Sequence, residues 1–484
     1  MPYENLRHFM SALESEGELK RVTRELDPVL EIPQVIDRTC KLPRGGPALL
    51  FERTGTPAPL LANALGSERR MAMGLSAPSV EHQARRIDEL IRRTPPEGLG
   101  DKVRTLTDLL RLSRALPRKV KSGRCKQVIR HGADADLADL PILQCWPGDG
   151  GRFITLPIVV TRDPETGARN VGMYRMHVYD GRTTGMHWHT HKVGAGHYRA
   201  AERLGRRLEV AVALGGDPAV TYAATAPLPE GVDEFLFAGF LREEPVALVQ
   251  CETCDLEVPA DAEYVIEGYV EPGERRMEGP FGDHTGYYSL AAPYPVFHVT
   301  CITHASDPVY PATIVGRPPM EDCFMAKATE RLFLPLLKMT LPEIVDINLP
   351  LEGIFHNLCV VSVRKAYPHH ARKVMHALWG LGQMMFTKMI VVVDEWVNVQ
   401  DMSEVIWRLG NNTDFVRDVI SFEGPVDALD HSGPRTHVGG KIGFDATRKW
   451  PEEGHDREWP DDIVMSPEVR DRIAAVWAEL GIEP

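Results

Sequence analysis

Apolar residues in the first 120 positions follow helical spacing in some segments and form short continuous runs in others. Residues 6–13 place leucine, phenylalanine and methionine at i, i+3, i+4 and i+7, which puts them on one face of a helix. A second helix is predicted over residues 79–93, and the apolar runs at 47–51 and 60–65 are typical of short buried strands. We therefore expect an N-terminal α/β domain over residues 1–120.

The pattern then changes to short β-rich runs separated by glycine and proline. Between residues 153 and 315 such runs recur with few segments of helical period, apart from helices predicted at 198–204 and 232–241. Many short strands bounded by turn residues are typical of an antiparallel barrel or sandwich. We assign this architecture to a middle domain over residues 121–320.

Strand and helix patterns alternate in the last third of the chain. The runs at 359–363 and 389–394 predict strands, with a long helix at 369–386 between them. A strand, a helix and a second strand in this order indicate a parallel βαβ unit. Near the end, Ser466 can cap a final helix whose first residue would be a proline. We expect a C-terminal α/β domain with this terminal helix over residues 321–484.

The composition is that of a soluble globular protein. The 484 residues are 43% hydrophobic and 25% charged, with a net charge of −13. An acidic chain without a dense lysine and arginine stripe is a poor candidate for nucleic-acid binding. No apolar run is long enough to cross a bilayer and the N-terminus lacks a signal pattern, so we expect a cytoplasmic protein. The eight cysteines are scattered, which argues against a disulfide framework.

The segment NVGMYR, residues 170–175, is the first candidate for chemistry. An arginine such as Arg175 beside a cleft can bind a carboxylate through two parallel hydrogen bonds. In a flat strand Asn170 would face the opposite side, unless Gly172 marks a bulge. The alternative is an ordinary strand with a surface arginine.

Three histidines alternate in the segment GMHWHTHK. A strand would put His187, His189 and His191 on one face, which resembles a metal site. The alternative is a polar strand face or the edge of a sheet. The adjacent Lys192 could bind a phosphate.

A loop rich in glycine and proline carries two acids. Glu278 and Asp283 bracket Gly279, Pro280 and Gly282, and a rigid loop of this kind can aim both carboxylates at one point. Close carboxylates push their pKa values apart, which would leave one of them protonated as a general acid. The alternative is a simple turn.

A cysteine pattern offers a rival site. Cys251 and Cys254 form CxxC, while Cys301 and His304 form CxxH, and together these are ligand types of structural zinc. The run VALVQC leads straight into Cys251 without a glycine-containing knuckle, so we expect both cysteines of the CxxC in a strand and no zinc. No GxSxG elbow, Walker loop or GxGxxG after a strand is present, so neither a ready nucleophile nor a dinucleotide fingerprint is evident.

Taken together, these segments resemble the UbiD decarboxylase family. The resemblance runs from about residue 4 to the C-terminal region. Its strongest blocks are residues 170–175, 237–242, 255–263, 278–288, 316–319, 341–350 and 444–451.

The resemblance implies a fold and a cofactor. The middle domain would be a split β-barrel related to flavin reductases that holds prenylated FMN. The metal ligands of the family fall on Asn170, His191 and Glu234, a mixed oxygen and nitrogen set that suits Mn²⁺ or Mg²⁺. The metal would connect the flavin phosphate to the protein, with K⁺ possible nearby. The flavin-contacting positions fall on Met173, Tyr174, Arg175, His187, Trp188, His189, Lys192 and Val193.

The resemblance also implies a reaction. The catalytic arginine and acids fall on Arg175, Glu278 and Asp283. Loss of CO₂ from an unsaturated carbon leaves a carbanion that needs an electron sink, which the flavin would provide. Arg175 would hold the carboxylate or organise the acids, and a protonated Asp283 or Glu278, poised near neutral pH, would return a proton to the carbon.

The expected substrate is an aromatic or other unsaturated acid. Asp283, where some members carry glutamate, is similar to the branch acting on hydroxylated aromatic acids, and quinone-pathway acids lead the candidates. Such a prenylated substrate would place the enzyme at a membrane surface. Heteroaromatic acids and the reverse carboxylation stay open. We also expect a prenylated-flavin synthase as cofactor supplier, and a homo-oligomer, either dimer or hexamer.

Two readings from other classes remain. One is a zinc hydrolase that uses His187, His189 and His191. The other is a binding or scaffolding protein that merely keeps the fold, against which the intact Arg175 and acid pair argue.

Overall fold

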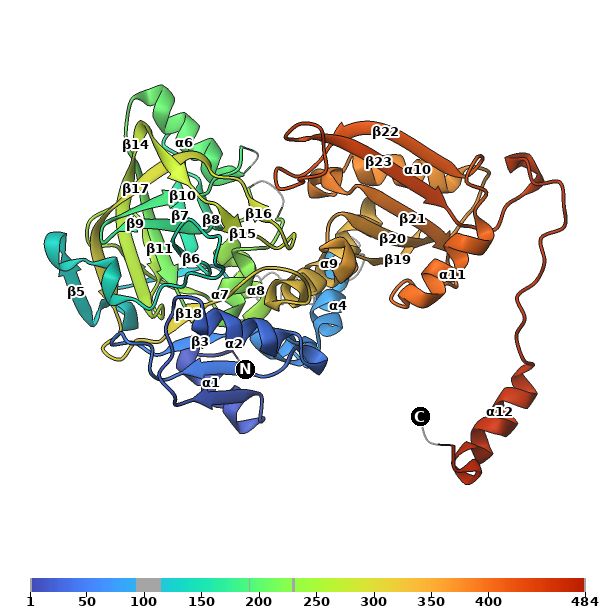
Figure 1. The fold of residues 1–484 in the computed structure, drawn as a ribbon, viewed down its shortest axis with the longest axis horizontal. Helices are drawn as coiled ribbons and strands as arrows, with labels where there is room; N and C mark the ends of the chain where they lie inside the picture. The colour runs from blue at the N-terminus through green and yellow to red at the C-terminus, as the bar shows by residue number, and fades with distance from the viewer. Residues whose placement is uncertain (1, 93–114, 191, 229–230, 483–484) are drawn as a thin grey trace, which may run out of the picture.

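The computed structural model describes residues 2–92, 115–190, 192–228 and 231–482. Figure 1 shows a barrel-like body with the N-terminal sheet beside it, a separate C-terminal sheet domain, and a terminal segment that leaves the body. The predicted α/β class is confirmed, and the sheet of the middle part of the chain forms a half-barrel. In the described ranges, no helix has both the length and the apolar character needed to span a bilayer.

The N-terminal region begins with the predicted helix, α1 (Leu6–Ser15). Its apolar residues are buried as expected, and the Asn5 side chain caps the helix by accepting a hydrogen bond from the backbone of His8. The sheet beside it joins β1 (Leu19–Val22), β2 (Ala48–Phe51), β3 (Leu60–Ala62) and β18 (Tyr310–Ala312). The helices of this region are α2 (Glu31–Cys40), α3 (Glu68–Gly74) and α4 (Val80–Ile91).

The barrel is a nine-stranded sheet whose neighbouring strands are antiparallel. Its strands are β5 (Val128–His131), β6 (Arg152–Ile154), β7 (Ile158–Arg162), β8 (Arg169–Met173), β9 (Met176–Asp180), β10 (Thr183–Met186), β11 (Leu208–Leu214), β14 (Tyr264–Glu278) and β17 (Ala292–His304). The predicted helices are α6 (Val193–Leu204), which starts five residues earlier than expected, and α8 (Glu234–Arg242). One hydrophobic core fills the space between this sheet and the N-terminal sheet, with Phe51 and Phe153 both fully buried in it. Smaller elements of this part of the chain are β4 (Arg118–Val120), α7 (Pro218–Ala223), β12 (Ala247–Gln250), β13 (Glu257–Pro259), β15 (Phe281–Gly282) and β16 (Tyr288–Ser289).

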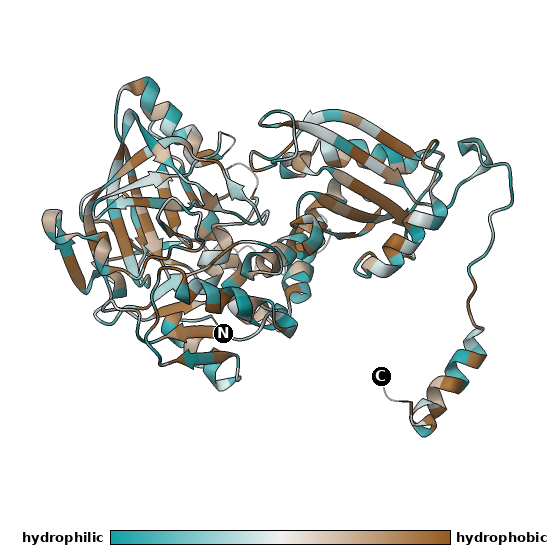
Figure 2. Cartoon of the chain, viewed as in Figure 1, coloured by the Kyte–Doolittle hydropathy of each residue, from teal (hydrophilic) through white to brown (hydrophobic). Residues whose placement is uncertain are grey.

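The C-terminal domain contains the predicted parallel pair, β20 (Leu358–Val363) and β21 (Met389–Asp394). The other strands of its sheet are β19 (Ile344–Asn348), β22 (Val419–Pro425) and β23 (Val438–Asp445), and its strands are rich in apolar residues (Figure 2). The prediction of a single long helix over 369–386 is wrong about where the helix ends. Helix α10 (His370–Trp379) ends before Gly380. A second glycine, Gly382, has a φ of 43°, a left-handed value at which the α-helix cannot continue, and only a short 3₁₀ turn follows.

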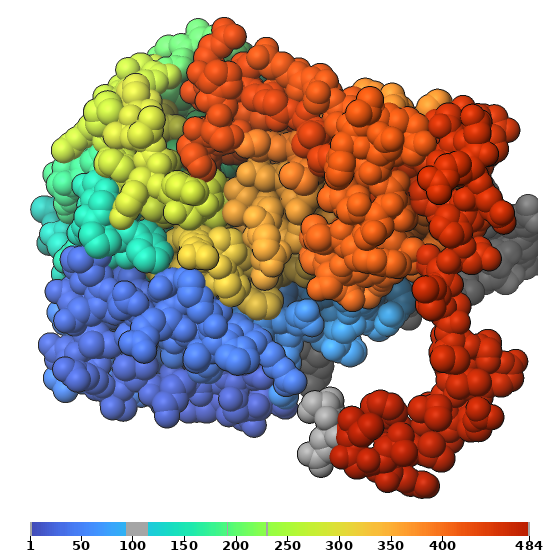
Figure 3. Space-filling view, turned by 45° about the vertical axis from the view of Figure 1, so that its right-hand side comes forward, coloured from blue at the N-terminus to red at the C-terminus, as the bar shows by residue number. Residues whose placement is uncertain are grey.

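Helix α9 (Glu321–Thr340) connects the barrel to the C-terminal sheet and packs against α4. Helix α11 (Met402–Asn412) covers the C-terminal sheet beside β21. The terminal helix α12 (Pro467–Val476) has Ser466 at its N-cap position and proline at its first position, as predicted, and none of its residues is buried. The space-filling view shows this segment standing apart from the body (Figure 3).

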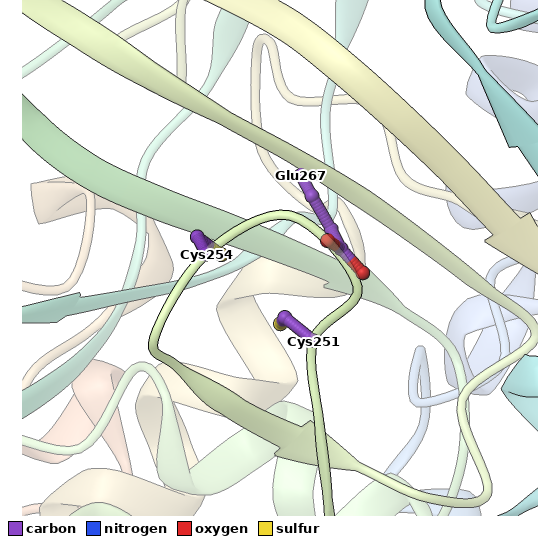
Figure 4. Close-up of side chains that lie close together, drawn as sticks. All are labelled: Cys251, Cys254 and Glu267. Atoms are coloured by element: carbon purple, nitrogen blue, oxygen red, sulfur yellow. The ribbon is translucent and has the colours of Figure 1, made fainter.

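The prediction that Cys251 and Cys254 lie in a strand is wrong. Strand β12 ends at Gln250, and the chain turns back so that the amide of Cys251 donates to the carbonyl of Leu256. Both cysteines are buried inside this turn, and their sulfurs lie within 4.8 Å of each other and of a Glu267 oxygen (Figure 4). The sequence pattern missed the turn because its anchor, Glu267 on β14, is remote along the chain. Among the described residues the CxxH pair does not join this group.

Candidate active site

Arg175 lies between the two acids that were predicted to act with it. Its Nε donates to Glu278 Oε1 at 2.8 Å and its Nη2 to Glu278 Oε2 at 3.3 Å, while Nη1 contacts Asp283 Oδ2. Glu278 is the last residue of β14, and Asp283 follows β15. Strand β8 ends at Met173, so Arg175 lies beyond the strand and the alternation that would have set it opposite Asn170 does not extend to it.

Three residues that the sequence analysis did not single out hold this cluster. Ser289 Oγ accepts a hydrogen bond from Arg175 Nη2 at 3.0 Å, and the guanidinium lies 4.5 Å from the centre of the Phe281 ring. Asp149 accepts from the backbone amide of Gly282 at 2.8 Å, which fixes the residue before Asp283. A loop acid far away in sequence gives no local pattern that would reveal this role.

The predicted strand of alternating histidines is wrong. Strand β10 ends at Met186, and the histidines that follow lie in irregular backbone, with His191 outside the described residues. His187 is nonetheless part of the site, because its Nδ1 lies 3.0 Å from Glu278 Oε2 and its Nε2 lies 2.5 Å from Nε2 of His189. Its ring also contacts the ring of Tyr294, with 4.4 Å between the centres.

The electrostatics differ from the expected pair with one protonated member. Burial alone would raise the pKa of Glu278, but the hydrogen bond with His187 and the charge of Arg175 lower it to about 2. Burial also opposes ionisation of Asp283, and Arg175 with His284 more than offsets it, so this pKa too is lowered. Neither acid is therefore poised near neutral pH in this arrangement, and both are ionised.

Two cavities meet the cluster. A cavity of about 190 Å³ is lined by Met173, Tyr174, Arg175, His187, His189, Lys192 and Asp283, among others. A larger one of about 710 Å³ extends from His187, Trp188 and His189 to the loop of residues 428–437 in the C-terminal domain. Seven of the eight positions expected to contact a flavin thus line these cavities, whereas Val193 is 53% exposed and lines neither.

Two of the three expected metal ligands are neighbours. Asn170 is buried on β8, and the adjacent amide of Val171 donates to Glu234 Oε2 at 3.1 Å from the first residue of α8. Burial raises the pKa of Glu234 to about 7, because the hydrogen bonds from backbone amides and the charge of Arg169 offset burial only in part. Carboxylate and amide oxygens are ligand types that suit a divalent ion, and Glu234 contacts the strand one residue from Asn170.

The chain matches the sequence models of three domains, each described as part of 3-octaprenyl-4-hydroxybenzoate carboxy-lyase. They are the N-terminal domain over residues 10–91, the Rift-related domain over 118–318 and the C-terminal domain over 323–446. The chain is therefore a carboxy-lyase. It belongs to the UbiD family, as its motifs predicted.

Similar proteins span the chain end to end. A protein of Archaeoglobus fulgidus without an assigned function is 52% identical over 99% of both chains. The UbiD-class enzyme HmfF from Pelotomaculum thermopropionicum, solved with FMN, is 32% identical with a TM-score of 0.80 and covers 96% of this chain and 98% of its own. Vanillic acid decarboxylase of Sedimentibacter hydroxybenzoicus in its closed form is 28% identical with a TM-score of 0.86, covering 100% of both chains.

Proposed function

We propose that this enzyme decarboxylates an aromatic acid with prenylated FMN and a divalent metal. The observation that carries the proposal is Arg175 held between Glu278 and Asp283 at the wall of a cavity. A guanidinium can exchange one carboxylate partner for another without leaving its place, and a substrate carboxylate is such a partner. The other UbiD-class structures with FMN and prenylated FMN support the cofactor.

The residues around the smaller cavity fit a phosphorylated flavin. Lys192 is the N-cap residue of α6, so its ammonium and the N-terminus of that helix can together bind a phosphate. The indole Nε1 of Trp188 is buried without a hydrogen-bond partner among the described residues, which leaves a donor for a bound group. When bound, the flavin would supply the electron sink that the carbanion needs.

Asn170, His191 and Glu234 would hold the metal next to that phosphate. Oxygen and imidazole ligands suit Mn²⁺ or Mg²⁺, and we include K⁺ as a second ion. The alternative of a zinc hydrolase loses support, because His187 is engaged by Glu278 and His189. Among the described residues His187 and His189 are in no group of possible metal ligands.

The residues of the chain then divide the work. In the absence of substrate, the positive charge of Arg175 is shared by Glu278 and Asp283. When Arg175 binds the substrate carboxylate, that carboxylate takes over part of this ion pairing. Loss of that charge raises the pKa of the acids, so that one of them can gain a proton. After CO₂ leaves, the protonated acid returns the proton to the carbon. We assign this donation to Asp283, since Glu278 stays bonded to His187.

For the substrate we propose a hydroxylated aromatic acid, with acids of quinone biosynthesis as the first candidates. The likeness to vanillic acid decarboxylase supports the hydroxylated ring. The three domain models are named after 3-octaprenyl-4-hydroxybenzoate carboxy-lyase, and this name specifies a prenylated hydroxybenzoate as the substrate of that enzyme. The larger cavity of about 710 Å³ offers room for a substituent on the ring. Carboxylation at high CO₂ is the same reaction in reverse.

The test is a substrate panel on enzyme produced together with a prenylated-flavin synthase. Hydroxybenzoates, with and without a prenyl chain, naphthoates and furoates are incubated with the loaded enzyme, and loss of acid is followed by chromatography. We expect turnover of at least one hydroxylated aromatic acid, and incorporation of ¹³C-bicarbonate into its product. No turnover of any acid by enzyme with a verified flavin spectrum would refute the proposal.

A further inference from the structure

A histidine pair connects the acid loop of the barrel to the C-terminal domain. His284 follows Asp283 directly, and its Nδ1 lies 2.9 Å from Asp283 Oδ1. On the other side, His284 Nε2 lies 3.0 Å from Nε2 of His356, which precedes β20. An ionised carboxylate only accepts, so His284 Nδ1 carries the proton of its contact with Asp283. The three side chains form a hydrogen-bonded chain from the proposed acid into another domain.

The loop that presents His356 has a strained backbone. Ile354 and Phe355 have φ angles of 45° and 49°, in the left-handed region that a β-branched or bulky residue rarely adopts. Such strain persists only where the surrounding structure enforces it, and it often accompanies function. Here it allows the ring of Phe355 to stack on His284, with 5.3 Å between the centres and 23° between the planes. His284 is thus held on its face by one residue and at its edge by the next.

The surroundings give the two histidines different charges. Burial opposes a charge on His284, but the hydrogen bond to Asp283 and nearby carboxylates outweigh it, so the pKa of His284 is raised. Burial and the neighbouring His284 lower the pKa of His356 to about 4, and its Nδ1 is buried without a partner among the described residues. A charged His284 that donates from both nitrogens, and a neutral His356 that accepts, account for the contacts. The charged groups facing the pair are Asp283, Asp322, Asp427 and Asp430, the last paired with Lys388.

We propose that His284 supplies the proton that recharges Asp283 in each turnover, and that His356 holds His284 in position for this transfer. The inference rests on the proposed role of Asp283 as the acid. When the substrate carboxylate has taken over the charge of Arg175, the Nδ1–H bond of His284 breaks and its proton passes to the ionised Asp283 at Oδ1, and Asp283 then gives a proton to the carbon that lost CO₂. His284 keeps its Nε2 proton, and its Nδ1 regains a proton from solvent when the product leaves. One proton is consumed for each CO₂ released, as decarboxylation of a carboxylate requires.

This arrangement makes proton supply depend on contact between two domains. His284 belongs to the barrel and His356 to the C-terminal domain, so separation of the domains breaks the Nε2–Nε2 hydrogen bond. Without this bond His284 can rotate away from Asp283. The proton supply is therefore complete only when the C-terminal domain lies close enough to the barrel for this hydrogen bond to form, as it does here.

The first experiment measures protonation directly and needs no substrate. Protein labelled with ¹⁵N-histidine is titrated by NMR, and the His284 signals are identified by their loss in His284→Asn. We expect His284 to titrate above the usual value of a histidine and to return toward that value in His356→Ala. His356→Gln keeps an acceptor and should keep the raised pKa, and the exposed His376→Asn on α10 is the control. A His284 that titrates normally, or ignores the loss of His356, overturns the proposal.

The second experiment uses flavin-loaded enzyme and a hydroxylated aromatic acid that the wild type turns over. His284→Asn keeps an amide donor toward Asp283 but no titrating proton, and we expect turnover to fall by about 10²-fold. The fall in rate as pH rises through the pKa of His284 should disappear in the variant, and added imidazole should restore part of the rate. Unchanged turnover with an unchanged pH profile overturns the proposal.

The two experiments separate this proposal from the proposed function. If no acid is turned over, the proposed function fails, while the titration still decides whether the His284 and His356 pair has the stated charges. If turnover is present and needs Asp283 but not His284, only the inference about proton supply fails.

Discussion

At the scale of single residues, the site depends on one cation that two anions share. Both acids are nearly inaccessible to solvent, with Glu278 at 0% and Asp283 at 5% exposure, and Arg175 is the charge that they share, with His187 and His284 as further partners. A buried charge that loses its partner is costly. If a substrate carboxylate binds at Arg175 as proposed, the pKa values of both acids rise together.

Asp283→Asn should spare the fold and flavin binding while it lowers turnover by about 10²–10⁴-fold, the usual contribution of a general acid. The amide keeps the size of the side chain but has no proton to transfer. Glu278→Gln should be similarly harmful, because the two acids act with Arg175 as a unit. Melting temperature and rate are measured on the same flavin-loaded samples. If both variants keep near wild-type turnover per flavin, the assignment of the acids is wrong.

The lowered pKa of Glu278 also predicts a pH dependence of stability. The folded value of about 2 lies below the ordinary 4.5, so ionised Glu278 stabilises the fold above the ordinary value and this contribution is lost as pH falls toward 2. The difference in unfolding free energy between wild type and Glu278→Gln should therefore shrink as pH falls from 4.5. Urea unfolding at several pH values measures it, and a constant difference would contradict the prediction.

The metal prediction concerns Asn170, His191 and Glu234. Glu234→Gln removes the charged ligand, and we expect it to weaken Mn²⁺ binding, followed by electron paramagnetic resonance of free Mn²⁺ during titration. Glu244→Gln, at an exposed position after α8, is the matched control. Equal Mn²⁺ affinity of wild type and Glu234→Gln would remove Glu234 from the ligand set.

Motifs identified the residues that lie together at the candidate site but not the residues that hold them in place. Arg175, Glu278 and Asp283 lie in dense sequence blocks, so their meeting was predictable. His356 is 72 positions from His284 and lies in no such block, so nothing in the sequence connects the two. The positive φ angles of Ile354 and Phe355 could not be predicted from the sequence either, because packing and not local preference imposes a left-handed conformation on such residues.

At the scale of elements, the turn that carries the CxxC is held by a carboxylate. The Glu267 oxygens accept hydrogen bonds from the backbone amides of residues 252 and 253, from Thr253 Oγ1 and from Lys126 Nζ. Each oxygen thus has two donors. The hydrogen bond between the thiols, together with burial, raises the pKa of Cys251. The group is better explained as a structural turn than as a metal site.

We therefore keep the prediction that Cys251 and Cys254 bind no zinc, now for a different reason. Elemental analysis of protein grown with added zinc should show less than stoichiometric metal. Cys254→Ser should leave that content unchanged. One zinc per chain, lost in Cys254→Ser, would prove the prediction wrong.

Elements were predictable where local pattern and packing agree. The spacing in α1 and the apolar runs of β20 and β21 satisfy both, and each element was found where predicted. Helix α10 ended early and β12 ended before Cys251, in both cases because contacts from elsewhere or glycine conformations outweigh the apolar pattern. The predicted strand of alternating histidines after β10 was wrong for the same reason, since His187 has its partner Glu278 on another strand.

At the scale of the whole molecule, the terminal segment exposes apolar side chains that the rest of the chain does not cover. Asp462 is paired with Arg408 at 2.6 Å, and beyond it Ile463, Val464 and Trp477 are 105%, 77% and 48% exposed. A helix as short as α12 is marginal in water unless its apolar side chains are covered. We infer that a second copy of the chain covers them.

We predict a homo-oligomer whose assembly needs this segment. Light scattering at micromolar concentration should give a multiple of the 54.0 kDa chain, and truncation after Asp462 should lower it. Trp477→Asp in the full chain should act in the same direction, with Glu479→Gln as a control. A full-length chain that runs at 54.0 kDa would count against the prediction.

The N-terminal sheet draws its last strand from a distant part of the chain. Strand β18 pairs in parallel with β3, and the same hydrophobic core joins this sheet to the barrel. During synthesis the ribosome releases the first three strands long before β18 emerges. The N-terminal region therefore completes its fold only after the whole barrel has left the exit tunnel, so that in this enzyme the first segment made is among the last to become native.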